Sequence, residues 1–284
     1  MRPYQSQTKA PAWHDTWKMV DQTADPEWFV RFLDTTRAKK RKKANAHPEQ
    51  YFAYLDLKPG HHVLELGCGT GEFLSPMAKL VGETGRLVGL DKSELMIEEA
   101  RKRATDPMIE FVIGDVHRLD FADKSFDRCF TTTLFQHLAN PQAALKELVR
   151  VTRPGGKIAV TEQDWDTLII NSENKEITRK ILNSFCDGIP NGRIGRELTG
   201  LFNDAGLGNV DVTTATFTST DIHWTEQTLG LAAMVSKAEQ SNVITNDEGT
   251  RWLAELDNLA RHSKFFAAFT AFCVVGSKPG PSYY

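Results

Sequence analysis

A short apolar run that breaks into alternating glycines constrains this chain's fold more than any other feature. The run is Val63 to Leu66, and Gly67, Gly69 and Gly71 follow it. When a buried strand ends this way and leads into a helix, its backbone N–H groups are open to a ligand, because no Cβ atom covers them. Dinucleotide-binding turns use a G-x-G-x-x-G spacing, so the G-x-G-x-G spacing here indicates a different ligand. The plainer alternative is an ordinary turn from strand to helix.

Strands and helices then alternate along the chain. Helical patterns separate strands that are predicted at Arg86 to Asp91, Ile109 to Ile113, Phe126 to Thr132 and Lys157 to Glu162. Ser93 is predicted to cap one helix. For another helix, Pro76 allows two possible starts: either Ser75 is its cap, or the helix begins earlier, directly after the glycine turn. Such alternation is typical of a parallel sheet covered on both faces. Ligands of these sheets bind beyond the carboxyl ends of the strands.

Three parts are predicted along the chain. Residues 1–45 form an N-terminal helical extension, residues 46–165 form the α/β core, and residues 166–284 complete the sheet with strands at Val210 to Thr218 and Phe266 to Val275. Helical patterns at about 166–205 and 222–262 are interpreted as a cap over the pocket. Within the extension, Trp13, Trp17 and Val20 recur at helical spacing. This stripe forms a lid over the pocket, docks on the core, or contacts a second subunit in a homo-oligomer.

A basic helix end follows that stripe. The Asp25-Pro26 pair is a helix start, and the helix is predicted to run to about Ala44. Six of the seven residues from Arg37 to Lys43 are basic and could bind phosphates. A solvated helix terminus is the favoured interpretation, since cations stabilise the negative end of the helix dipole.

Composition excludes several classes of protein. A chain of 284 residues with 40% apolar residues can bury a full core. It has no apolar run near the roughly 20 residues of a membrane span, and Met1 to Gln5 lacks the apolar core of a secretion signal. A cytoplasmic protein with no membrane partner is expected. No metal site is predicted, because the four cysteines stand far apart. The net charge of −3 gives no global attraction to nucleic acid.

Two acidic residues end neighbouring strands beside the glycine turn. Asp91 lies 20 residues past Gly71, where its carboxylate can accept both hydroxyls of a ribose, unless it caps the next helix. Asp115 follows the next strand and can accept a hydrogen bond from the exocyclic amine of an adenine, with Val116 and Met96 on the faces of the ring. The alternative for Asp115 is an Asx residue that stabilises a turn.

The fourth strand adds a third element. The carbonyls of Thr131 and Thr132 are predicted to receive an ammonium group, and Glu65 is close enough to help through a hydrogen bond or a water molecule. A ribose acceptor, an adenine acceptor and an ammonium site around one glycine turn together describe S-adenosylmethionine.

Residues 62–162 resemble the small-molecule branch of the class I S-adenosylmethionine-dependent methyltransferases, the group that includes the ubiquinone and menaquinone methyltransferases. The matching stretches keep that family's order and spacing: Val63 to Gly71, Val88 to Asp91, Gly114 to Val116, Phe126 to Leu138, and Arg153 to Gly156. The resemblance implies a Rossmann-like, doubly wound α/β fold with a seven-stranded sheet. It also implies S-adenosyl-L-methionine as cofactor, with its backbone at Gly67, Gly69 and Gly71, its ribose at Asp91, its adenine at Asp115 and its methionine end at Thr131 or Thr132.

The resemblance does not identify the methyl acceptor. Family members often carry His or Asn where this chain has Gln136, so His137 is the only imidazole in that loop. Methyl transfer is an in-line displacement, for which the protein mainly aligns the nucleophile and removes water. His137 is the first candidate general base, although it could instead pack beneath the loop. Asp164 is the second, or else a helix cap, and Glu162 and Trp165 are expected to overlook the same pocket.

The sequence is compatible with three functions. The favoured one is methyl transfer to an O, N or C atom of a small, partly apolar metabolite, because the inserted helices are rich in apolar residues. A nucleic-acid methyltransferase that uses Arg37 to Lys43 is less favoured. The fourth strand ends in Thr-Thr-Thr-Leu rather than Asn/Asp-Pro-Pro-aromatic, and the chain has no Pro-Cys dipeptide. The third is a homologue that binds the cofactor without methylating.

Overall fold

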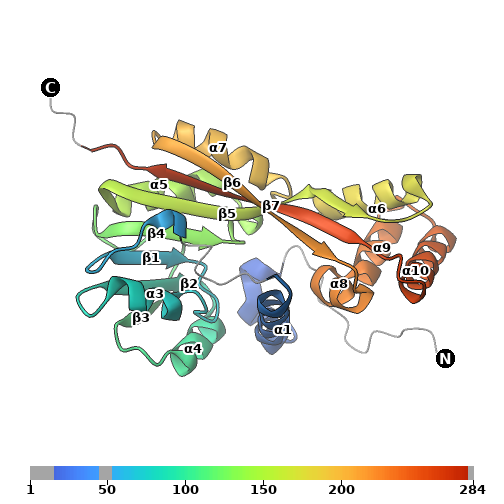
Figure 1. Ribbon diagram of the computed structural model, residues 1–284, viewed down its shortest axis with the longest axis horizontal. Helices are drawn as coiled ribbons and strands as arrows, with labels where there is room; N and C mark the ends of the chain where they lie inside the picture. Colours follow the sequence, from blue (N-terminus) through green and yellow to red (C-terminus); the bar gives the residue numbers. More distant parts are fainter. Residues whose placement is uncertain (1–15, 45–52, 281–284) are drawn as a thin grey trace.

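The protein folds around one mixed sheet (Figure 1). The structure, a computed structural model, describes residues 16–44 and 53–280, and for residues 37–44 it describes the backbone alone. In this part of the chain seven strands pair in the order β3-β2-β1-β4-β5-β7-β6. They are β1 (His62–Leu66), β2 (Arg86–Asp91), β3 (Ile109–Ile113), β4 (Phe126–Thr132), β5 (Thr152–Ile170), β6 (Gly208–Ser219) and β7 (Ala267–Ser277).

Strands β1 to β5 are parallel, and β7 is antiparallel to both of its neighbours. Helices α3 (Leu74–Val81) and α4 (Glu94–Arg103) pack on one face of the sheet, and α5 (Pro141–Val151) and α7 (Ile194–Asp204) pack on the other. Successive side chains of β1 point to opposite faces of the sheet. Val63 is buried under α3, and Leu64 is buried under α5. The predicted Rossmann-like, doubly wound, seven-stranded fold is confirmed.

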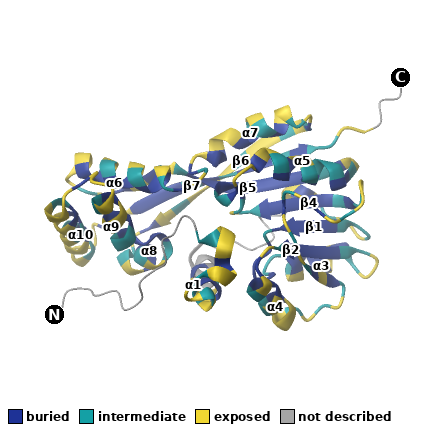
Figure 2. Ribbon diagram, turned by 180° about the vertical axis from the view of Figure 1, so that it is seen from behind, coloured by how far each residue is buried: buried dark blue, intermediate teal, exposed yellow. Residues whose placement is uncertain are grey.

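Strand β5 is much longer than the predicted Lys157 to Glu162. It runs to Ile170, and beyond Thr161 it pairs with β7 alone. The ribbon of β5, β6 and β7 therefore projects past the parallel strands and carries α6 (Lys175–Asp187), α8 (Ile222–Leu229), α9 (Leu231–Gln240) and α10 (Asn246–Arg261) (Figure 1). These cap helices enclose a second apolar core that contains Trp252 and Leu256, and Figure 2 shows buried residues continuing from the sheet into this region.

The cap differs from its predicted extent in two ways. Helix α7 packs against β5, β6 and β7, so it belongs to the sheet layer and not to the cap segment predicted at 166–205. The helical pattern predicted at 222–262 is interrupted at Gly230, which adopts a left-handed conformation between α8 and α9.

The N-terminal elements lie between the core and the cap. The 3-10 helix η1 (Trp17–Gln22) leads to α1 (Pro26–Ala44), which contacts both α4 and α8 (Figure 1). Trp17 and Val20 pack with Phe29 and Met96, so this part of the predicted stripe docks on the core. Trp13 and the side chains of Arg37 to Lys43 lie outside the described residues, and the homo-oligomer stays a prediction.

The structure confirms one of the two predicted serine caps. The Ser93 hydroxyl caps α4 by accepting a hydrogen bond from the Met96 N–H at 3.2 Å. Helix α3 begins at Leu74, so the glycine turn leads into it before Pro76 and Ser75 is not its cap. Two short 3-10 helices complete the fold, η2 (Ala53–Leu55) and η3 (Phe135–His137). Among the described residues, no helix has the length and apolar character that crossing a membrane requires.

Candidate functional site

A cavity of about 460 Å³ lies at the carboxyl ends of the parallel strands. One end, the glycine end, is formed by Gly67, Gly69, Asp91, Met96, Asp115 and Val116. The other, the cap end, is formed by Thr133, Gln136, Gln163, Trp165, Phe185, Ile189, Thr228, Leu229 and Phe269. Thr132 and His137 also line the cavity, and η1 and α1 contribute Trp17, Phe32 and Leu33. The volume is typical of a small-molecule site.

The glycine turn is built from residues with positive φ. Gly67, Gly69 and Gly71 have φ angles of 66°, 51° and 75°. Gly67 and Gly69 line the cavity, whereas Gly71 does not. A Cβ atom on Gly71 would lie 2.8 Å from the Phe111 ring. Gly71 therefore allows the turn to pack closely on Phe111 of β3, and its predicted contact with the cofactor stays a prediction.

Asp91 ends β2 inside the cavity wall. Its Oδ2 accepts a hydrogen bond from the Gly69 N–H at 2.8 Å, and its Oδ1 accepts one from the Ser93 N–H at 2.9 Å. Burial raises the pKa of this carboxyl group, and these backbone donors oppose the rise. Each oxygen keeps a second lone pair for a ligand hydroxyl. The turn and the carboxylate thus hold each other in place.

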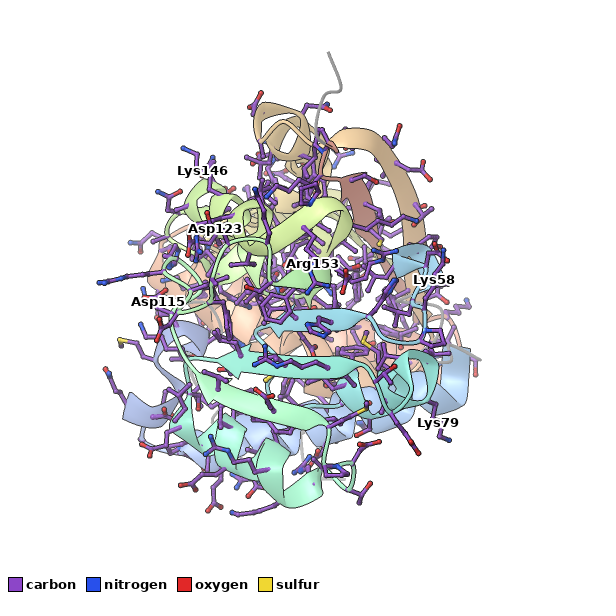
Figure 3. All side chains as sticks on the ribbon, turned by 90° about the vertical axis from the view of Figure 1, so that its left-hand side faces the viewer. Lys58, Lys79, Asp115, Asp123, Lys146 and Arg153 are labelled. Atoms are coloured by element: carbon purple, nitrogen blue, oxygen red, sulfur yellow. The ribbon has the colours of Figure 1, made fainter. Side chains whose placement is uncertain are left out.

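Asp115 lies beyond β3, on the opposite side of the molecule from Lys58, which precedes β1 (Figure 3). Its Oδ1 lies 2.9 Å from the backbone nitrogen and 2.7 Å from the ring Nδ1 of His117. The hydrogen bond from that backbone N–H leads the effects that lower the Asp115 pKa, so the carboxyl group is ionised at neutral pH. This side chain is about half exposed, so Oδ2 is accessible to a ligand.

Two predicted residues are buried in the sheet instead of facing the cavity. Glu65 and Thr131 are each only 1% exposed, and neither lines the cavity. Thr132, the last residue of β4, does line it. Of the two threonines predicted at the methionine end, the structure brings Thr132 to the cavity.

Glu162 stabilises the loop after β4 through hydrogen bonds to its backbone. Its Oε1 accepts hydrogen bonds from the N–H groups of Leu134 and Phe135, both at 2.6 Å. Burial raises the Glu162 pKa to about 8. Glu162 does not reach the cavity, contrary to the expectation that it overlooks the pocket. His137 does line the cavity, and its ring centroid lies 6.0 Å from that of Trp17.

Asp164 does not line the cavity, which argues against its predicted role as a base. It is fully buried, and its carboxylate forms a two-point ion pair with Arg196, in which the guanidinium Nη2 lies 2.7 Å from Oδ1. The Arg196 N–H also donates to Oδ2 at 3.3 Å. Asp164 therefore stabilises the start of α7, which is close to the alternative interpretation as a helix cap.

Most of the cap end was missed by sequence reasoning. Thr133, Gln163, Phe185, Ile189, Thr228, Leu229 and Phe269 line the cavity without having been predicted there. Gln163 had a usable signal in the sequence, because it directly follows the strand predicted at Lys157 to Glu162, and ligands bind beyond the carboxyl ends of such strands. The residues from α6, α8 and β7 had none, since only the packing of the cap brings them to the strand ends.

Comparison with known proteins agrees with this geometry. Residues 64–160 match a family model described as a methyltransferase domain. A 37.1 kDa protein in transposon TN4556 of Streptomyces fradiae is 40% identical over 223 residues, covering 78% of this chain and 64% of that protein, so the chain spans less than two thirds of this relative. Demethylmenaquinone methyltransferase from Bacillus cereus is 28% identical over 166 residues, covering 57% of this chain and 67% of that protein.

A solved structure supports the fold. The YcgJ protein of Bacillus subtilis matches with a TM-score of 0.57 at 15% identity, covering 82% of this chain and 97% of that chain. At this identity the match concerns the fold alone. Together with the methyltransferase-domain match and the seven-stranded sheet, it agrees with the motifs quoted above. Residues 64–160 therefore form a methyltransferase domain, and the chain has the seven-stranded fold of the class I methyltransferases.

Proposed function

We propose that the protein transfers a methyl group from S-adenosyl-L-methionine to an O, N or C atom of a small, partly apolar metabolite. The observation that carries this proposal is the single cavity that joins the glycine end to the cap end. One end has the groups that an adenosyl ligand requires, and the other has an apolar wall for an acceptor.

The residues of the glycine end fit the cofactor. Asp91 has free lone pairs for the ribose hydroxyls, and the accessible Asp115 oxygen suits the adenine amine. Met96 and Val116 supply apolar surface at the same end of the cavity. The bound cofactor supplies the electrophilic methyl group, and the protein's part is to align the acceptor and exclude water.

His137 is the residue we propose as general base for an acceptor that must lose a proton. It lies in the loop that joins the two ends of the cavity, and it lines the cavity itself. Its position in η3 is held by the buried Glu162 beneath the same loop. Asp164 is not part of this proposal, because Arg196 occupies its carboxylate.

The first test is binding of S-adenosylhomocysteine, followed by thermal melting. At a hundredfold excess over its Kd, the ligand should raise the Tm by about 5 °C. Asp91→Ala should abolish this shift. Asp115→Ala should reduce it, because the adenine amine loses a hydrogen-bond acceptor. Asp115 is exposed, so its replacement should not affect folding. Asp257→Ala, at an exposed carboxylate on α10, is the matched control and should keep the full shift.

Two results would contradict the proposed function. The first is a folded wild-type protein whose Tm does not respond to S-adenosylhomocysteine. The second is an undiminished shift in both Asp91→Ala and Asp115→Ala. Circular dichroism of each variant without ligand separates loss of binding from loss of folding.

A further inference from the structure

A chain of four side chains, joined by three hydrogen bonds, crosses the wall of the cap end. The indole Nε1–H of Trp165 donates to Oε1 of Gln136. The Nε2 of Gln136 lies 3.4 Å from Oε1 of Gln163, and the Nε2 of Gln163 lies 3.3 Å from the Thr133 hydroxyl. Gln136 and Gln163 are only 2% and 6% exposed, and both line the cavity.

The indole fixes the direction of this chain. An indole nitrogen is a donor only, so the group that Gln136 turns toward Trp165 must be its carbonyl oxygen. The Gln136 amide nitrogen then faces Gln163, which must present its own carbonyl oxygen in return. The Gln163 amide nitrogen is therefore directed toward Thr133. No amide in the chain is free to exchange its oxygen and nitrogen without losing a hydrogen bond.

This direction determines what the wall can recognise. A primary amide nitrogen carries two N–H groups, and each glutamine uses one of them within the chain. The Thr133 oxygen accepts from Gln163, which leaves the Thr133 hydroxyl proton to donate. The groups that remain available to a ligand are thus mainly hydrogen-bond donors. A ligand oxygen that accepts hydrogen bonds would match them.

The surroundings of this chain are uncharged and apolar. The Trp165 ring lies 5.3 Å from Phe185 and 5.0 Å from Phe269 between centroids, and Ile189 and Leu229 complete the wall. Among the described residues, the lysines and carboxylates that line the cavity come from η1 and the ends of β2 and β3. A cationic amine at the cap end would therefore meet no carboxylate.

Resting on the proposed function, we propose that Gln163 and Thr133 determine specificity for a methyl acceptor with a carbonyl or phenolate oxygen on an apolar, ring-sized body. The oxygen accepts hydrogen bonds from the Gln163 amide and the Thr133 hydroxyl. The body packs between Trp165, Phe185 and Phe269. Amines that are protonated at neutral pH are selected against.

The test compares two probes that share one bicyclic body, 1-tetralone with a carbonyl and 1-aminotetralin with an ammonium group. Each is titrated into the S-adenosylhomocysteine complex and followed by ligand-observed NMR. Wild type should bind 1-tetralone at least about fivefold more tightly than 1-aminotetralin, and Gln163→Leu should weaken 1-tetralone about fivefold. Gln163→Glu replaces the donor with acceptors, so it should reverse the preference between the probes. Gln142→Leu makes the same change at an exposed position of α5 outside the cavity and should leave both affinities unchanged.

Equal binding of the two probes, no binding of either, or a wild-type preference for the ammonium probe would overturn this inference. The same holds if Gln163→Glu, folded and still binding S-adenosylhomocysteine, keeps the wild-type preference. Absence of S-adenosylhomocysteine binding in wild type contradicts the proposed function instead, so the two failures are distinguishable.

Discussion

Two polar side chains, those of Glu162 and Asn191, hold the loop after β4, on which Gln136 and His137 lie. Glu162 accepts hydrogen bonds from two backbone N–H groups of this loop. From the other side, the Asn191 amide donates to the carbonyls of Phe135 at 3.0 Å and Leu138 at 2.7 Å. An unsatisfied buried backbone group costs about 1–3 kcal/mol, so these two side chains stabilise one loop conformation.

The protonation of Glu162 predicts how stability depends on pH. Burial raises its pKa from 4.5 to about 8 in the folded protein. Between these values the folded chain keeps a proton that the unfolded chain releases, so the free energy of unfolding should fall as pH rises through this window. In Glu162→Gln, the decrease in the free energy of unfolding across this pH window should be smaller by about 1–4 kcal/mol. Urea unfolding at several pH values between 5 and 8 measures it.

Glu197→Gln is the control for this prediction, because Glu197 is an exposed residue of α7. Its stability curve should follow the wild-type pH dependence. If Glu162→Gln also follows that curve, the assignment of a protonated Glu162 is wrong.

At the scale of elements, the carboxylate of Asp21 ties η1 to the start of α4. Asp21 accepts hydrogen bonds from the Ser93 hydroxyl at 2.6 Å and from the Glu94 N–H at 2.8 Å. These donors lie at the start of α4, directly after Asp91. Trp17 on the same element contacts Phe29 and Phe32 and approaches His137. The geometry supports the lid interpretation, which stays a prediction.

Asp21→Ala tests that interpretation. Loss of these hydrogen bonds should loosen η1, so hydrogen exchange at residues 17–22 should accelerate and the affinity for S-adenosylhomocysteine should fall about five- to tenfold. Global stability should change by less than about 2 kcal/mol, because Ser93 still caps α4. Glu27→Ala, which removes an exposed partner of Arg31, is the control. Unchanged affinity together with faster exchange would show that η1 moves without covering the ligand.

At the scale of the whole molecule, the sheet and the cap share continuous strands. Strands β5 and β7 pair from Lys157 with Ser277 near one end to Ile170 with Ala267 at the other. The first part of this ribbon contacts α5 and α7, and the last part carries the cap helices. The cap end of the cavity thus depends on the second apolar core, whereas the glycine end depends on the sheet.

Trp252→Ala separates these two dependences. Trp252 is 1% exposed in the cap core, and its indole N–H donates to the Thr178 hydroxyl at 2.9 Å. The substitution should lower the free energy of unfolding by about 3–5 kcal/mol and accelerate hydrogen exchange in α8, α9 and α10. Binding of S-adenosylhomocysteine should persist while binding of 1-tetralone is lost.

The control for this prediction is Leu80→Ala, at an exposed position of α3. This substitution should leave the affinities for both ligands unchanged. Equal loss of both ligands in Trp252→Ala would show that the cap and the glycine end are not independent.

Much of the fold could be predicted because its signals are local. The bounds of β2, β3 and β4 agree with their predicted ranges, and Ser93 caps the predicted helix. Short buried strands between turn residues and side-chain caps depend on neighbours within a few positions. The same locality made the ends of β2 and β3 recognisable, which is why Asp91 and Asp115 were identified together with the glycine turn.

The sequence by itself determined the alternation of strands and helices, the glycine turn and the two carboxylates beside it, because residues close along the chain specify each of them. The tertiary structure alone decided the length of β5, the ion pair that occupies Asp164, and the cap end with Gln163 and Phe269. Each of these depends on contacts between residues far apart in the chain, such as Asp164 with Arg196 and Ile170 with Ala267. Periodicity and spacing carry no record of such partners, since they describe only what a residue's neighbours in sequence require.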